Sequence, residues 1–113
     1  MLRLTTWLVA AGLTLVGAAC SVTGTVDGTM EDGSETFQGT VTGYMDRSGI
    51  LQVSSNRGAQ CKGTWLFVTD RLGRGTFRCE DGRSGPFEFV STGSHGTGTG
   101  RLADKRFTFT FTR

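Results

Sequence analysis

Large apolar side chains recur at every second residue over most of this chain. The stretch "CKGTWLF" (61–67) and the stretch "FTFTF" (107–111) show the pattern most clearly. Because successive side chains of a strand point to opposite faces, each stretch predicts a strand with one apolar face and one polar face. Such strands form antiparallel, half-buried sheets. The residues predicted on the apolar face are Cys61, Trp65, Phe67, Phe77, Cys79, Phe87, Phe89, Phe107, Phe109 and Phe111.

Short turn sequences separate these segments. Glu-Asp-Gly occurs at 31–33 and again at 80–82, Asn-Arg-Gly at 56–58 and Asp-Lys at 104–105. Glycine supplies the positive φ that a tight hairpin turn requires. The residues expected in turns are Asp32, Gly33, Asn56, Gly58, Asp81 and Gly82. A chain of 113 residues with 18 Gly and one Pro is therefore predicted to form one domain of many short strands.

The sequence also repeats itself with an offset of 24 residues. When 37–53 ("FQGTVTGYMDRSGILQV") is laid over 61–77 ("CKGTWLFVTDRLGRGTF"), a Gly-Thr pair, an Asp-Arg pair and a further Gly coincide. A period in the twenties indicates stacked supersecondary units. We therefore expect successive hairpins of similar construction.

One segment resembles a known repeat. In Gly73–Phe89, "GRGTFRCEDGRSGPFEF", paired glycines precede an Asp-Gly turn and an aromatic strand, which is similar to a MORN repeat. It departs from that pattern at Gly85-Pro86, and the likeness runs from about Gly28 to Phe111. The resemblance implies an all-β antiparallel meander of about four MORN-like hairpins in residues 28–113, laid side by side in an elongated sheet. It also implies a scaffold or contact surface without catalytic chemistry.

The N-terminal residues have the order of a secretory signal. In "MLRLTTWLVAAGLTLVGAAC", Arg3 precedes the uncharged run Leu4–Val16, and small residues follow at 17–19. This order predicts a cleaved signal peptide at 1–19. The apolar run is shorter than the roughly 20 residues that span a bilayer, and a retained short anchor is the alternative.

Cys20 follows the small residues, an arrangement that resembles the lipobox of bacterial lipoproteins. The resemblance implies a diacylglyceryl group and a fatty acyl group on Cys20, with no other cofactor, and residues 20–27 as a tether. Ser21 in place of Asp implies the outer membrane, facing the periplasm, in preference to the inner membrane. Gly17 stands where the family usually has Leu, so ordinary signal peptidase cleavage is the alternative.

The two other cysteines are predicted to form a disulfide. Cys61 and Cys79 remain as a pair, and the periplasm is oxidising. Closing this loop stabilises a fold by roughly 3 kcal/mol. The alternative is a metal or redox site, but neither Cys has another two residues away, and His95 is the one histidine.

The candidates for catalysis have simpler interpretations. Asp46-Arg47 and Asp70-Arg71 are interpreted as turns, and Glu80-Asp81 as solvated because adjacent strand residues face opposite sides. The segment Gly93–Gly100 lacks the Lys of a phosphate-binding loop and is interpreted as a flexible turn plus edge strand. We predict no catalytic residue and no metal site.

Charge divides unevenly along the chain. Residues 20–46 contain five acidic and no basic residues, whereas residues 47–113 contain 11 basic and five acidic ones. The basic part predicts attraction to an anionic envelope component, with a simple solvated surface as the alternative. The predicted compartment excludes nucleic acid.

These observations together predict a small lipid-anchored cell-envelope protein that acts as a non-catalytic binding or scaffold module. One alternative is a periplasmic inhibitor or small-ligand carrier of closed β-barrel type, with a protruding loop such as Ser91–Gly100. The other is an enzyme centred on His95.

Overall fold

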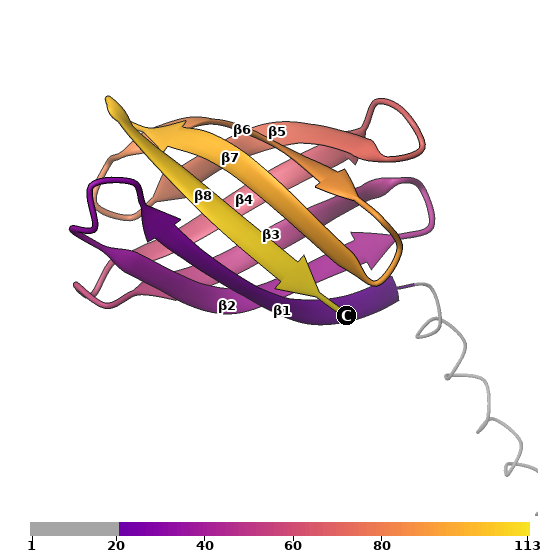
Figure 1. Cartoon of the computed structure of the whole chain (residues 1–113), viewed down its shortest axis with the longest axis horizontal. Helices are drawn as coiled ribbons and strands as arrows, with labels where there is room; N and C mark the ends of the chain where they lie inside the picture. Colours follow the sequence, from indigo (N-terminus) through magenta and orange to yellow (C-terminus); the bar gives the residue numbers. More distant parts are fainter. Residues whose placement is uncertain (1–20) are drawn as a thin grey trace, which may run out of the picture.

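A computed structural model describes residues 21–113, so the predicted signal peptide (1–19) and Cys20 lie outside the described residues. The described chain forms eight consecutive antiparallel strands, and each strand pairs with the next (Figure 1). The strands are β1 (Ser21–Met30), β2 (Thr36–Tyr44), β3 (Ser48–Ser55), β4 (Gln60–Phe67), β5 (Leu72–Cys79), β6 (Ser84–Ser91), β7 (His95–Leu102) and β8 (Lys105–Thr112). The predicted all-β antiparallel meander is confirmed.

The sheet closes on itself. β1 pairs with β8 as well as with β2, and the β8 register runs from Thr25↔Thr112 to Met30↔Phe107. This corrects the elongated open row of hairpins that the MORN resemblance implied. Closure removes both sheet edges, and eight strands enclose an interior just wide enough for side chains. The apolar face predicted from alternation is therefore the inside of a barrel.

Residues 21–27 are also not a separate tether, since they form the first part of β1. The reason is visible in their alternation, because Val26 is buried in the core and pairs with both Gly39 and Phe111. The strand therefore begins seven residues before the boundary expected at residue 28.

The 24-residue repeat corresponds to two successive hairpins. β2 and β4 begin at residues 36 and 60, and β3 and β5 begin at residues 48 and 72. The repeated Asp-Arg pairs lie in the connections 45–47 and 68–71, which are at the same end of the barrel (Figure 1). The predicted turns at Asp46-Arg47 and Asp70-Arg71 are confirmed.

The interior is filled by aromatic rings that lie across glycines on the neighbouring strand. Gly49 pairs with Trp65, and Gly73 pairs with Phe89. A Cβ atom at either glycine would overlap the facing ring. Inward glycines therefore make the room that the large rings occupy. The buried core residues are Val26, Met30, Phe37, Leu51, Val53, Cys61, Trp65, Phe77, Cys79, Phe87, Phe89, Leu102, Phe107 and Phe109.

The connections alternate between two ends, which we call the closed end and the open end. The closed end carries the connections 31–35, 56–59, 80–83 and 103–104. The predicted turn residues Asp32, Gly33, Asn56, Gly58, Asp81 and Gly82 all lie there, and the three glycines have positive φ of 77°, 90° and 98°. The open end carries the connections 45–47, 68–71 and 92–94, together with Ser21 and the C-terminal Arg113 (Figure 1).

Candidate functional site: an apolar cavity at the open end

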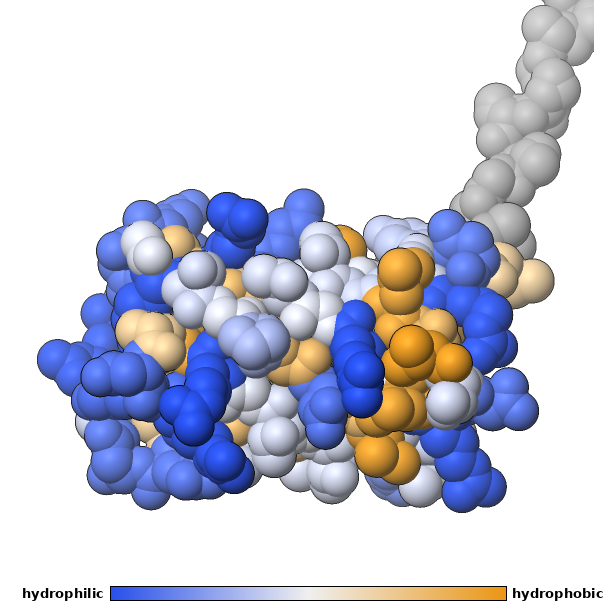
Figure 2. Space-filling view, turned by 90° about the horizontal axis from the view of Figure 1, so that it is seen from above, coloured by the Kyte–Doolittle hydropathy of each residue, from blue (hydrophilic) through white to orange (hydrophobic). Residues whose placement is uncertain are grey.

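The two ends of the barrel differ in their surface. Figure 2 looks at one side of the barrel, with the open end to the right, and apolar side chains gather toward that end while hydrophilic ones dominate the other. The exposed large apolar residues are Val22, Tyr44, Met45, Leu66, Val68 and Val90. Each belongs to the part of a strand or connection nearest the open end.

A small apolar cavity lies inside this end. It has a volume of about 120 Å³, and its walls come from strands around the barrel, including Val22, Val41, Leu51, Trp65, Phe67 and Phe111. Ser91 and Arg113 add polar atoms to its lining. An engineered cavity of about 150 Å³ with similar aliphatic and aromatic walls binds benzene. This cavity therefore has room for about one ring or the end of an alkyl chain.

Trp65 forms one wall of the cavity and is held by its neighbours. Its ring meets Phe67 and Phe89 edge-on, with ring centres 5.1 and 5.0 Å away. Gly49, its paired residue, lies beneath the ring. The indole Nε1–H is buried and has no hydrogen-bond partner among the described residues. An unpaired buried donor costs about 1–3 kcal/mol, so a ligand acceptor at this position would recover free energy.

Arg47 lies beside the cavity and joins two connections of the open end. Its guanidinium donates to the carbonyl of Thr69 at 2.9 Å and lies 3.7 Å from the carboxylate of Asp70. The same group sits over the ring of Phe67, 5.4 Å from the ring centre. Phe67 lines the cavity, so Arg47 places a positive charge near the apolar opening.

Asp46 caps the turn of residues 45–47 at the open end. It accepts hydrogen bonds from the backbone N–H of Ser48 at 3.1 Å and from the Ser48 hydroxyl at 2.6 Å. These two bonds lower the pKa of the Asp46 carboxyl below its ordinary value. The side chain therefore acts as an anionic turn cap, in agreement with its structural interpretation.

An ion pair crosses the opposite end. Glu35 is buried and accepts two hydrogen bonds from Arg83, at 2.7 and 3.0 Å. Glu35 precedes β2 and Arg83 precedes β6, and these strands are four apart in the ring of eight. The hydrogen bonds from Arg83 lower the pKa of Glu35 despite its burial, and those to Glu35 and Asp81 raise the pKa of Arg83.

Two fully buried side chains, Met30 and Leu102, fill the barrel near the same end. Met30 ends β1 and Leu102 ends β7, so both belong to the end that the ion pair crosses, and protein atoms seal it. Among the described residues, the apolar opening of the interior is therefore at the other end of the barrel.

The predicted disulfide is confirmed. Cys61 and Cys79 are bonded to each other and occupy directly paired positions on β4 and β5, close to the closed end. Both side chains face the interior, as the alternation indicated. Within residues 21–113, no group of three or more His, Cys, Asp or Glu side chains is arranged to hold a metal ion.

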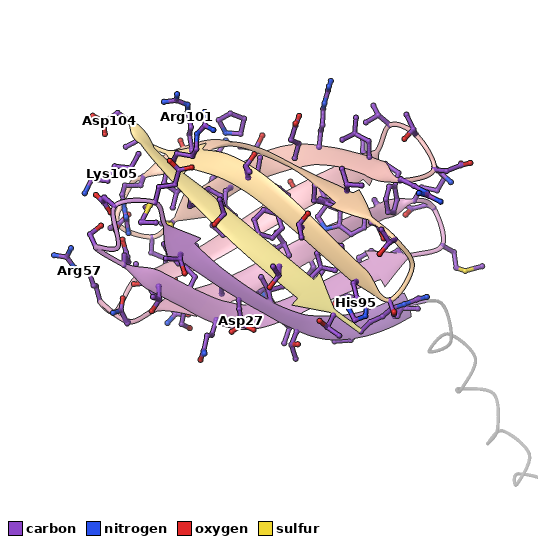
Figure 3. The ribbon with its side chains drawn as sticks, in the orientation of Figure 1. Asp27, Arg57, His95, Arg101, Asp104 and Lys105 are labelled. Atoms are coloured by element: carbon purple, nitrogen blue, oxygen red, sulfur yellow. A yellow bond between two sulfur atoms is a disulfide. The ribbon has the colours of Figure 1, made fainter. Side chains whose placement is uncertain are left out.

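The prediction of a protruding loop at Ser91–Gly100, made for the inhibitor alternative, is wrong. β6 continues to Ser91 and β7 begins at His95, which leaves a connection of residues 92–94. The glycines at 96, 98 and 100 face inward and make room for the rings of Phe111, Phe109 and Phe107 on β8. The glycine-rich stretch is therefore a strand inside the closed sheet. His95 is exposed at the open end (Figure 3).

The outside of the barrel carries the basic residues. Lys62 pairs directly with Arg78 across β4 and β5, and Arg101 pairs with Arg106 across β7 and β8. Like charges that lie directly opposite are unfavourable for a sheet. Both pairs lie toward the closed end, where Figure 3 also places Arg57, Asp104 and Lys105.

At the closed end Lys105 lies 3.1 Å from Asp32. Two hydrogen bonds from Ser34, with help from Lys105, lower the Asp32 pKa to about 2.

Sequence reasoning missed three features of the site: the cavity, the role of Trp65 in it, and the Glu35–Arg83 ion pair. Trp65 was correctly placed on the apolar face, but its cross-strand glycine was not identified. The available signal for the ion pair was weak: Glu35 and Arg83 each follow an Asp-Gly turn, at slightly different spacings.

The chain matches no family model and no curated protein sequence. It is similar in structure to designed β-barrels. One is a redesigned β-barrel, mFAP1, bound to DFHBI, with 18% identity and a TM-score of 0.64 over 80% of this chain and 92% of that one. EF1p2_mFAP2b bound to DFHBI gives 15% identity and a TM-score of 0.67 over 80% and 90%. A de novo designed fluorescence-activating β-barrel gives 15% identity and a TM-score of 0.63 over 80% of this chain and 90% of that one. At these identities the likeness concerns the fold alone.

Proposed function

We propose that this protein is a non-catalytic binding module whose barrel takes a small apolar ligand through its open end. The observation that carries the proposal is the apolar cavity lined by Trp65, whose buried indole N–H has no hydrogen-bond partner among the described residues. Ligand sites are mostly apolar concavities with a few placed polar groups, and the mouths of β-barrels are among their preferred places. The ligand class is a ring or chain end with one hydrogen-bond acceptor.

The similar barrels support this proposal at the level of the fold. Two of them are described as bound to DFHBI, a small molecule. An eight-stranded barrel of this size is therefore able to hold a compact ligand when its interior leaves space. In this chain the aromatic rings leave about 120 Å³, so only part of a larger ligand would enter.

We also propose that the module is anchored to the cell envelope through lipid on Cys20, at the outer membrane and facing the periplasm. The support is the sequence order of the first 20 residues, which the described residues do not include. Among the described residues, no helix is long and apolar enough to cross a membrane. The basic outer pairs leave an anionic envelope component as a proposed partner.

The ligand proposal is tested by comparing acetophenone with ethylbenzene, two single-ring molecules of similar shape that differ by a carbonyl acceptor. Residues 21–113 contain the entire closed sheet and are suited to ligand-observed NMR in plain buffer. We expect both molecules to bind. We expect acetophenone to bind about two- to tenfold more tightly, because a hydrogen bond contributes about 0.5–1.5 kcal/mol. Trp65→Phe should bring the two affinities together.

A blocking variant and its matched control make the test specific to the cavity. Gly43 lines the cavity, and a Cβ atom there would meet Trp65 at an ordinary 3.6 Å, so Gly43→Leu should fill the space without breaking the fold. Thr40→Leu adds the same side chain on the outside of β2. The proposal fails if neither molecule binds, or if Gly43→Leu binds them as well as Thr40→Leu does.

The alternative of an inhibitor or small-ligand carrier of closed β-barrel type agrees with the closed sheet, but its protruding loop is absent because the connection at 92–94 is short. The small-ligand part of that alternative is the one that the present proposal develops. The enzyme alternative requires an acid or a nucleophile that bonds to the His95 ring. Among the hydrogen bonds of the described side chains, His95 takes part only through its backbone carbonyl, which accepts from the Thr92 hydroxyl. A binding role therefore remains the function that the geometry favours.

A further inference from the structure

We infer that the open end of the barrel docks directly on a lipid bilayer, with the cavity opening toward the membrane surface. This goes beyond the proposed ligand site, because it concerns exposed residues around the opening, of which only Val22 also lines the cavity, and it holds whether or not the cavity binds a ligand. We call the surface concerned the apolar rim, defined as Val22, Tyr44, Met45, Leu66, Val68 and Val90.

The apolar rim is unusual in its exposure. Met45 is 79% exposed, Leu66 62% and Val68 56%. Soluble proteins scatter single exposed apolar residues, but a cluster marks an interaction site. Here all six residues lie at one end, and Figure 2 shows the apolar side chains gathered toward it.

Three of the six rim residues, Leu66, Val68 and Val90, lie on β4, in the connection 68–71 and on β6. Leu72 pairs with Val90 across β5 and β6, and its carbonyl accepts a hydrogen bond from the backbone N–H of Val68. Leu66 projects outward from β4, because it lies between the inward-facing residues 65 and 67. Met45 and Tyr44 extend the surface to the tip of the neighbouring hairpin, so apolar side chains reach around much of the opening.

The position of the N-terminus identifies the occupant. Ser21 begins β1 at the open end (Figure 1). Residue 20 and the apolar run Leu4–Val16 are therefore attached at this end. Whether lipid on Cys20 or the apolar run itself holds the membrane, the attachment brings the apolar rim, and not the charged end, next to the bilayer. β1 lies opposite β5 in the ring of eight, so contact on both sides requires the barrel to stand upright.

The charges agree with this orientation. The charges of the open-end connections balance, because Arg47 and Arg71 are matched by Asp46 and Asp70, and Arg47 lies 3.7 Å from Asp70. The closed end holds the acidic and basic residues that a bilayer interior would exclude, including Glu35, Arg83, Asp104 and Lys105. A barrel that stood on its closed end would place these charges against the membrane.

The test uses Trp65 as a reporter at the opening. The full chain with Trp7→Phe has Trp65 as its one tryptophan. It is reconstituted into phosphatidylcholine vesicles, with and without bromine on the acyl chains, which quenches indole emission on close approach. We expect brominated lipid to cause a loss of Trp65 emission. The rim variant, Met45→Ser with Leu66→Ser and Val68→Ser, should lose most of that quenching while staying attached to the vesicles.

A matched control keeps the result interpretable. Thr76→Ser with Thr99→Ser and Thr108→Ser alters three exposed residues away from the rim and should leave the quenching unchanged. Circular dichroism checks that both triple variants keep the sheet. Equal emission in plain and brominated vesicles overturns the inference. A dimer in detergent that only the rim variant dissociates, with unquenched Trp65, would assign the apolar rim to a second copy of the chain instead.

Discussion

At the scale of single residues, the barrel depends on glycines that face inward. Eight strands can enclose large aromatic rings only where the neighbouring strand has no side chain in the way. Gly49 shows this most directly, since the ring of Trp65 lies where its Cβ would be, and the carbonyl of Thr42 lies close on the other side. A Cβ atom at Gly43 would meet the same ring at an ordinary distance of 3.6 Å.

This difference gives a prediction from two alanine substitutions that bear on one tryptophan. Gly49→Ala should lower the free energy of unfolding by about 1–3 kcal/mol, because the new methyl group overpacks the core and displaces Trp65. Gly43→Ala should be close to neutral. Urea denaturation followed by Trp65 emission in a Trp7→Phe chain measures both. Equal stability of the two variants would contradict this account of the glycines.

Glu35 gives a second prediction at this scale, which concerns pH. Its pKa is lowered from the ordinary 4.5 mainly by hydrogen bonds from Arg83. In acid the unfolded chain therefore takes up its proton first, so the stability from this group is present above pH 4.5 and is lost as the pH falls through the lower folded pKa. Asp32, Asp46 and Asp81, whose pKa values are also lowered, act in the same direction.

Glu35→Gln should therefore cost about 1.5–3 kcal/mol at neutral pH, because it removes hydrogen bonds to a charged group and leaves Arg83 partly unpaired. The loss should shrink as the pH falls from 4.5 toward the lower folded pKa, since the carboxylate of the parent chain is protonated first in the unfolded state and then in the folded state. Thermal unfolding at a series of pH values measures this convergence. The exposed Glu88, in a 3.5 Å ion pair with Arg74, offers a control in Glu88→Gln, which should change stability at neutral pH by under about 0.5 kcal/mol.

At the scale of strands and turns, most of the structure was predictable from the sequence. Alternation assigned the inward residues of β4, β5, β6 and β8, and Asp-Gly pairs located the turns at 32–33 and 81–82. β7 was missed in part because its inward positions are glycines, which give no apolar signal. β1 was cut short because residues 21–27 carry only two apolar side chains, Val22 and Val26. Both strands are specified by their partners and not by their own side chains.

The disulfide also belongs to this scale, because it joins two strands that already pair. Cys61→Ala with Cys79→Ala should lower the free energy of unfolding by roughly 3 kcal/mol, the loop-closure value for an 18-residue separation. Chemical denaturation with and without a reductant provides an internal control. Reductant should destabilise the parent chain by a similar amount and leave the double variant unchanged. Equal stability of the parent chain and the double variant would show that sheet pairing alone fixes the two strands.

At the scale of the whole molecule, closure was the property that local sequence could not decide. The same alternating strands suit an open row of hairpins or a barrel, and the choice depends on whether β1 meets β8. That contact joins residues about 85 positions apart, such as Val26 and Phe111, and no local pattern reports it. The cavity at the open end exists only because of closure, so it was equally hidden from sequence reasoning.

Closure also gives the molecule a polarity along its axis. One end is sealed by an ion pair and covered with charge, and the other combines an apolar opening, an apolar rim and the start of the described chain. In the upright orientation inferred above, the proposed ligand would enter from the bilayer side. The basic outer pairs Lys62–Arg78 and Arg101–Arg106 would then face away from that membrane, toward any anionic partner in the envelope.

This arrangement depends on how the chain is attached, which leads to a prediction for Cys20. If its thiol carries the lipid, a bacterial host grown with a labelled fatty acid should incorporate label into the parent chain and not into Cys20→Ala. Cys61→Ala with Cys79→Ala is the matched control, because these cysteines are bonded to each other inside the barrel, and it should keep the label. Equal labelling of the parent chain and Cys20→Ala would exclude Cys20 as the site of acylation. Label absent from both, with the protein still in the membrane fraction, would instead indicate that the apolar run Leu4–Val16 is retained as the anchor.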